Sequence, residues 1–190
     1  MKQILKAAFI GLLFASSAAL AQEAPTAGSG GPQVKRVGDW LVRCFPVQNP
    51  SPCDIFQEMS NPDTRQRVVS LSIAYVPSMD RHAMQIAVPL EVALQRGLTI
   101  QTNSFTSPVF KYRRCDRTGC YVELAVDNNL VASLSKSAQD AKINVVADGG
   151  KTYALNFSLK GFAAAHDDMA AQARAKAKPV SDPPAAAPAP

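Results

Sequence analysis

The chain has 190 residues, enough for one domain with appendages and too few for most multidomain enzymes. It carries 20 Lys and Arg against 15 Asp and Glu, a net charge of +5, and 47% of its residues are hydrophobic. This positive excess is mild for the length, so composition alone does not indicate a nucleic-acid-binding protein. The positions of the charged residues along the chain are needed to interpret this net charge.

Residues 1–21 have the parts of a secretory signal peptide. Lys2 and Lys6 supply the positive start, residues 7–15 form an apolar run, and Ala19 and Ala21 are the small residues that a signal peptidase accepts. The apolar run is well below the ~20 residues that span a bilayer, and no cysteine for a lipid anchor follows the cleavage site. We therefore expect cleavage, and a mature chain in the periplasm or outside the cell with no integral membrane segment.

The mature chain divides into three parts by composition. Residues 22–36 are rich in Ala, Gly, Ser and Pro, which predicts a flexible linker. Over residues 37–162, apolar and polar side chains mainly alternate, the pattern of half-buried strands, and roughly eight to ten short strands are separated by turn residues. This pattern predicts an all-β domain, an antiparallel β-sandwich. Within it, Asp127, Asn128 and Asn129 predict a tight turn into a strand over 130–134.

Residues 163–190 form an Ala- and Pro-rich C-terminal segment. Its first half places acids early and bases late, as a helix dipole favours. Met169 is the one large apolar residue between 163 and 178, so the sequence predicts a short helix or tail with little face to bury.

The cysteines fit an oxidising compartment. An even number of them remains after cleavage, which favours two disulfides. The spacing favours two short loops around turn residues, each stabilising by about 2–3 kcal/mol. A four-cysteine zinc site has closer pairs than the eight and four intervening residues found here, so we expect no metal. The expected pairs are Cys44 with Cys53 and Cys115 with Cys120.

No catalytic constellation is found in the sequence. The two histidines, His82 and His166, lie beside no nucleophile motif, and lone histidines of this kind are more often surface residues than ligands. The sequence has no Gly-x-Ser-x-Gly, no His-Glu-x-x-His and no phosphate-binding Gly-rich loop. We expect no enzymatic activity and no cofactor.

The densest charge surrounds the second cysteine pair and forms a candidate binding patch. One interpretation is a surface for an anion or an acidic partner. The other is a solvated hairpin end whose arginines pair with nearby acids, since sheet edges often carry charge. Nucleic acid is not expected for an exported chain without a binding motif. The patch consists of Lys111, Tyr112, Arg113, Arg114 and Arg117.

Four segments, in order, resemble motifs of the invasion-associated locus B family of exported bacterial proteins. They are Gly-Asp-Trp-Leu-Val-Arg-Cys at 38–44 with Cys-Asp-Ile-Phe-Gln at 53–57, Val-Pro-Leu-Glu-Val-Ala-Leu at 88–94, Cys-Asp-Arg-Thr-Gly-Cys at 115–120, and Ser-Leu-Lys-Gly-Phe-Ala-Ala-Ala at 158–165. Glu91 departs from the glycine that the family often has. The motifs span essentially the whole expected domain.

The resemblance implies an immunoglobulin-like β-sandwich in the envelope of a Gram-negative bacterium, with no catalytic residues. It also implies a role in host-cell invasion, and so in virulence, for pathogenic members. The leading hypothesis is a non-enzymatic envelope or secreted protein that acts through protein–protein contact with an unidentified envelope or host protein. The alternative is a periplasmic carbohydrate- or peptidoglycan-binding module, which would need exposed aromatic side chains along one sheet face.

Overall fold

The computed structural model describes residues 30–46, 49–137 and 140–177. The expected signal peptide, the first part of the expected linker and the end of the C-terminal segment lie outside these residues. Within them the elements are β1 (Gln33–Val37), β2 (Trp40–Cys44), β3 (Cys53–Ser60), β4 (Arg67–Val76), η1 (Pro77–Met79), β5 (Arg81–Val88), β6 (Leu98–Gln101), β7 (Arg114–Asp116), β8 (Gly119–Val126), α1 (Asn128–Lys136), β9 (Ala141–Val146), β10 (Thr152–Phe157) and α2 (Phe162–Lys176).

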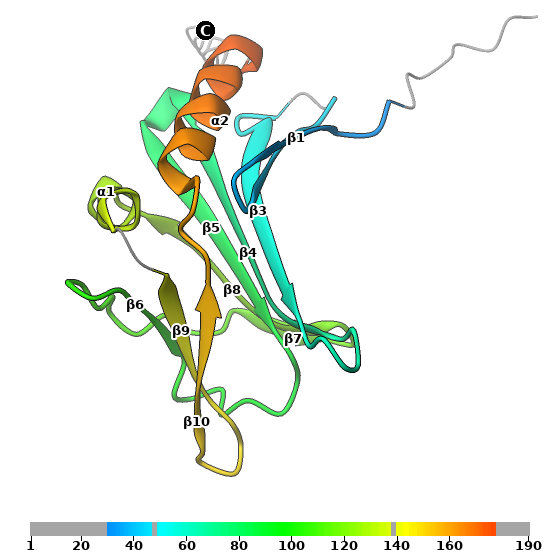
Figure 1. Ribbon diagram of the computed structural model, residues 1–190, viewed down its shortest axis with the longest axis vertical. Coiled ribbons are helices and arrows are strands. Elements are labelled where there is room, and N and C mark those ends of the chain that lie inside the picture. The colour runs from blue at the N-terminus through cyan, green and yellow to red at the C-terminus, as the bar shows by residue number, and fades with distance from the viewer. Residues whose placement is uncertain (1–29, 47–48, 138–139, 178–190) are drawn as a thin grey trace, which may run out of the picture.

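The strands form two antiparallel sheets, which confirms the expected all-β fold class with a C-terminal helix. The larger sheet has seven strands in the order β1-β2-β3-β4-β5-β8-β7, and the smaller has three in the order β10-β9-β6. Figure 1 shows α2 and the small sheet on the same side of the large sheet. The core lies between these layers.

The alternation in the sequence places one face of each long strand in the core. In β4, Leu71, Ile73 and Tyr75 are buried, and in β5 Met84 and Ile86 are buried beside them. The side chains between them point to the other face of the sheet, because successive residues of a strand alternate sides. The two-residue alternation therefore supplies one sheet face to the core and an opposite face that points away from the core.

Helix α2 packs against β2, β3 and β4 and is part of the core. Phe162, Met169 and Ala173 are at most 1% exposed, and the ring of Phe162 meets Trp40 edge-on at 5.1 Å between centroids. The expectation that this segment has little face to bury is therefore wrong. Alanine methyls spaced along one helix face fit closely against a sheet, so a helix poor in large side chains can still be buried.

A polar junction joins the large sheet to the chain that enters α2. The Gln57 side chain donates to the carbonyl oxygens of Asp39, at 3.2 Å, and Ser158, at 3.1 Å. Its Oε1 accepts from the Ser158 backbone N–H at 2.8 Å, and Trp40 Nε1 also donates to the Ser158 carbonyl at 3.0 Å. Gly161 follows with a φ of 83°, where a Cβ would lie 2.7 Å from a carbonyl oxygen of β1. This junction fixes where α2 begins.

Two local expectations differ from the structure. Residues 130–134 are not a strand, because Asp127 accepts a hydrogen bond from the Leu130 N–H at 3.0 Å and caps helix α1. Asp at such a position favours a helix start as readily as a turn. The strand β1 also begins at Gln33, inside the stretch 22–36 that predicts a linker, because all five residues of β1 pair with β2.

Candidate functional site

The second cysteine pair closes the hairpin of β7 and β8. The structure joins Cys115 to Cys120, and Cys44 to Cys53 at the other end of the sheet, as the spacing predicts. In the hairpin turn, Asp116 Oδ1 accepts from the backbone N–H of Thr118 at 2.8 Å and from its hydroxyl at 2.6 Å. These hydrogen bonds lower the pKa of Asp116, because they stabilise the charged carboxylate. The loop therefore keeps a fixed negative charge at its centre.

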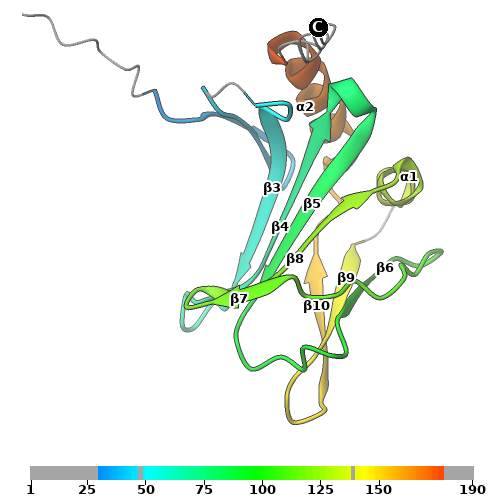
Figure 2. The same ribbon diagram turned by 180° about the vertical axis from the view of Figure 1, so that it is seen from behind.

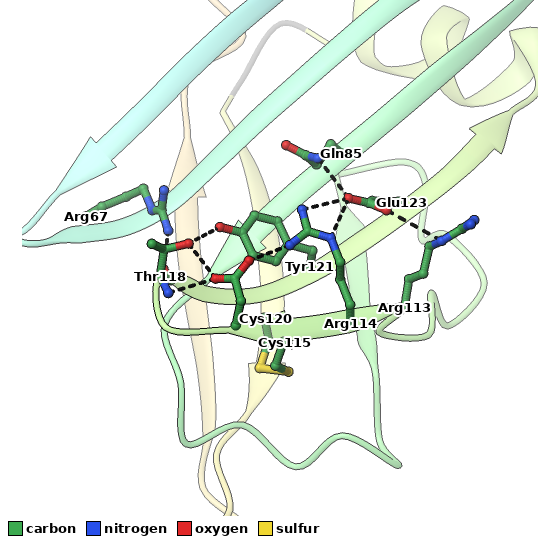
Figure 3. Close-up of polar contacts among 10 residues, drawn as sticks. Arg67, Gln85, Arg113, Arg114, Cys115, Thr118, Cys120, Tyr121 and Glu123 are labelled. Atoms are coloured by element: carbon green, nitrogen blue, oxygen red, sulfur yellow. Dashed lines mark hydrogen bonds and ion pairs between the residues drawn. A yellow bond between two sulfur atoms is a disulfide. The ribbon is translucent and has the colours of Figure 1, made fainter.

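Arg114 and Glu123 organise the face beside this loop (Figure 3). The guanidinium of Arg114 lies 3.9 Å above the ring of Tyr121 and pairs with both Asp116 and Glu123. Glu123 also pairs with Arg113 Nε at 3.6 Å and accepts from Gln85 at 3.0 Å. Arg113 and Arg114 of the candidate binding patch thus form ion pairs with acidic residues, as expected for a solvated hairpin end.

The other members of the patch have separate environments. Lys111 donates to the Gln95 carbonyl oxygen at 2.9 Å, and Arg117 is exposed at the loop and forms no ion pair with the described residues. Tyr112 is half-buried, and burial raises its pKa to about 12. Binding by this patch stays a prediction, because none of these contacts identifies a partner.

A second arginine–aromatic stack lies elsewhere on the large sheet, and the sequence analysis missed it. Arg43 lies 3.8 Å above the ring of Phe56 and pairs with Asp54, which also accepts from Ser72 Oγ at 2.6 Å. The register explains the pair: Cys44 is opposite Cys53, so the preceding Arg43 is opposite Asp54. The expected pairing of Cys44 with Cys53 in a hairpin therefore also places Arg43 opposite Asp54.

Small side chains line much of the surface between the two stacks. A shallow hollow of about 390 Å³ lies there over β4, β5 and β8, and its lining includes Ser72, Ala74, Ala83, Gln85, Arg113, Glu123 and Ala125. Figure 2 shows this face of the large sheet, with α2 and the small sheet behind it. None of the described helices or strands covers it. We call this surface, from the Arg43 stack to the Arg114 stack, the outer face.

His82 is buried and His166 is half-buried, which corrects the interpretation of both as surface residues. His82 is 4% exposed, and its Nε2 lies 2.9 Å from Nε2 of His166 on α2. They are 84 residues apart in the sequence, so only the docking of α2 brings them together. No group of three or more metal-ligating side chains gathers anywhere in the described ranges.

Among the described residues, none of the helices combines the length and the hydrophobicity that spanning a bilayer requires.

Comparisons with known proteins agree on one family. The family model described as invasion associated locus B protein matches residues 40–170. Two relatives described as invasion protein B homologs, from Brucella abortus strain 2308 and biovar 1 strain 9-941, are each 28% identical over 134 residues, covering 70% of this chain and 76% of theirs. The crystal structure of invasion associated protein b from Bartonella henselae aligns with a TM-score of 0.65 and 20% identity, covering 75% of this chain and 99% of that one, and so shows the shared fold. The chain belongs to the invasion associated locus B family.

Proposed function

We propose that this protein is an exported, non-enzymatic binding protein that acts through contact between its outer face and an acidic surface of a partner protein. The observation that carries the proposal is the pair of ion-paired arginine–aromatic stacks at the two ends of an uncovered sheet face. Arginine and aromatic residues are enriched at protein interfaces and among the side chains that contribute most to binding. A face already ordered by ion pairs loses less entropy on binding.

The charge of this face favours an acidic partner. Arg113 keeps 71% of its side chain exposed although it pairs with Glu123, and Lys111 and Arg117 are exposed nearby. Asp116 and Glu123 are both engaged by Arg114, so the charge that remains free at this end of the face is positive. Such a surface steers an acidic partner and binds it more weakly at high salt.

The disulfides and the family support an extracytoplasmic compartment for this protein. Two disulfides among four cysteines fit the periplasm or a secreted protein, and they support the expected signal peptide. Relatives named as invasion proteins suggest a partner in the bacterial envelope or on a host cell. A role in host-cell invasion is part of the proposal for this chain.

The test is crosslinking in intact cells followed by identification of the captured protein. Arg113→Glu with Arg117→Glu reverses exposed charge and leaves the Arg114 stack in place. The control, Lys142→Glu with Lys160→Glu, makes the same change in net charge at exposed positions away from the outer face. We expect the first variant to lose the captured protein at least fivefold and the control to retain it, with capture by the natural chain falling as salt rises. Equal capture by both variants would contradict the proposal.

The carbohydrate-binding alternative has less support in the structure. Trp40, Tyr75 and Tyr121 are at most 8% exposed, so they do not form an open aromatic row on a sheet face. Tyr153, at 45% exposed, lies beside a separate apolar groove between the sheets. Retention of the protein on sedimented peptidoglycan sacculi, undiminished in Arg113→Glu with Arg117→Glu, would favour the alternative over protein contact.

A further inference from the structure

The contact between His82 and His166 joins three elements. His82 is the second residue of β5, and His166 lies in the second turn of α2. The Nδ1 of His82 is 3.1 Å from Oδ1 of Asn128, the first residue of α1. The pair thus sits where both helices meet the large sheet.

The hydrogen bonds fix where protons can be. The Asn128 Oδ1 can only accept, so His82 Nδ1 carries a hydrogen, and in the neutral ring Nε2 carries a lone pair. That lone pair accepts from the N–H of His166 Nε2. The Nδ1 of His166 faces Asp167 Oδ1 at 3.3 Å. A hydrogen on Nε2 of both rings would set two N–H groups against each other at 2.9 Å, so the docked pair holds at most one hydrogen between its facing nitrogens.

The charged and titratable neighbours come from every element around His82. Tyr75 on β4 lies 5.2 Å from the His82 ring between centroids and donates to Asp80, which precedes β5. Arg174 on α2 donates to the Tyr75 hydroxyl at 3.2 Å. Burial lowers the pKa of His82 below 6.5, and the nearby His166 lowers it further. Asn128 and Asp80 oppose this shift, and Arg174 adds the smallest lowering effect.

We propose that the His82–His166 pair is a pH-sensitive lock that holds α2 on the large sheet and weakens when His82 takes a proton. This inference does not depend on the proposed binding function. The docked helix buries His82 and disfavours its protonated form, whereas with α2 undocked the His82 ring reaches water and takes the ordinary histidine pKa of about 6.5. The equilibrium constant for docking of α2 is therefore highest above about pH 6.5. It falls by up to tenfold per pH unit as the pH drops from there towards the lower pKa of docked His82.

Weakened docking would uncover apolar surface of the large sheet. Trp40, fully buried, packs edge-on against Phe162 of α2 and lies among the buried residues of β2. The lock therefore couples a change in pH to the exposure of an apolar face that is closed at neutral pH. No further ligand or subunit is needed for this response.

Trp40 also supplies the assay, because it is the one tryptophan of the chain. The measurement is acrylamide quenching of tryptophan fluorescence in the full-length protein between pH 7.5 and 5.0. We expect quenching of the natural protein to rise as pH falls, with a midpoint below 6.5. His82→Gln keeps an acceptor for His166 and cannot be protonated in this range, so its quenching should stay constant. Carboxylates are the same in both proteins, so their titration cancels in the comparison.

A flat response of the natural protein, or an equal rise in His82→Gln, would overturn the proposal. Far-UV circular dichroism at pH 7.5 shows whether the variant folds. If His82→Gln does not fold, NMR titration of the imidazole C2–H resonances in the natural protein tests the proposal instead. One histidine titrating below 6.5 and responding to the other supports the lock, whereas two independent titrations near 6.5 exclude it.

Discussion

Replacing Gln57 with methionine tests whether the polar junction holds the large sheet to the start of α2. Gln57 is 6% exposed and makes three hydrogen bonds, two to carbonyl oxygens and one to the Ser158 N–H. Methionine fills nearly the same volume, so little of the effect comes from a cavity. The variant therefore removes the hydrogen bonds and leaves their partners in place.

The expected loss can be estimated bond by bond. Each hydrogen bond contributes about 1 kcal/mol net, and a buried donor left unpaired costs about 1–3 kcal/mol. The Ser158 carbonyl keeps its bond from Trp40, so the Ser158 N–H and the Asp39 carbonyl are the groups left unpaired. We expect Gln57→Met to lower the free energy of unfolding by about 2–4 kcal/mol, or Tm by roughly 5–15 °C for a chain of this size.

Urea unfolding monitored by circular dichroism measures this loss. The matched control is Gln85→Met on the outer face, where an exposed Gln85 donates to Glu123. That change should cost less than about 0.5 kcal/mol, because solvent replaces the lost partner. A loss for Gln57→Met within about 0.5 kcal/mol of the control would show that the junction contributes little, and the reasoning would fail.

Three further predictions are checked by the same unfolding measurement. Gly161→Ala should destabilise by at least about 1–2 kcal/mol, because the left-handed backbone strains any side chain and its Cβ would meet backbone atoms at 2.7–3.0 Å, whereas Gly149→Ala, with nothing within 4 Å, should be close to neutral. Tyr112→Phe should leave stability unchanged or raise it, because the buried hydroxyl has no hydrogen-bond partner among the described residues; a loss above about 1 kcal/mol would reveal one. Cys115→Ser with Cys120→Ser should cost about 2 kcal/mol, since the closed loop is short, and an unchanged midpoint would mean that the bridge does not restrict the unfolded chain.

Local pattern was sufficient for much of the fold. Period-two alternation identified β4, β5 and β8, because a strand with one buried face must alternate. Cysteine spacing identified the pairs that the structure joins, because each pair flanks a short turn. Pattern failed at Asp127, whose side chain can begin either a turn or a helix. The choice there depends on Leu130 and Leu134 reaching the core, which is a tertiary contact.

The outer face also combines features that the sequence predicts with features that only the folded sheet creates. The residues around the second cysteine pair stood out as a dense run of charge, but their pairing depends on Glu123 from the neighbouring strand. Arg43 lies in no such run of charge, and its partner Asp54 lies directly opposite it on the neighbouring strand β3. Strand register determines which charges meet, and register follows from the hydrophobic pattern only once the strand order is known.

The sequence by itself determined most of the long strands, which cysteines lie close along the chain, and to which family the motifs point. Only the tertiary structure decided what α2 does. Its small side chains carry too little hydrophobic area to predict docking, yet they are buried because the large sheet offers a surface that fits them. That docking also brings His166 against His82. Contacts between residues so far apart depend on the closure of the whole fold, so no local pattern in the sequence contains them.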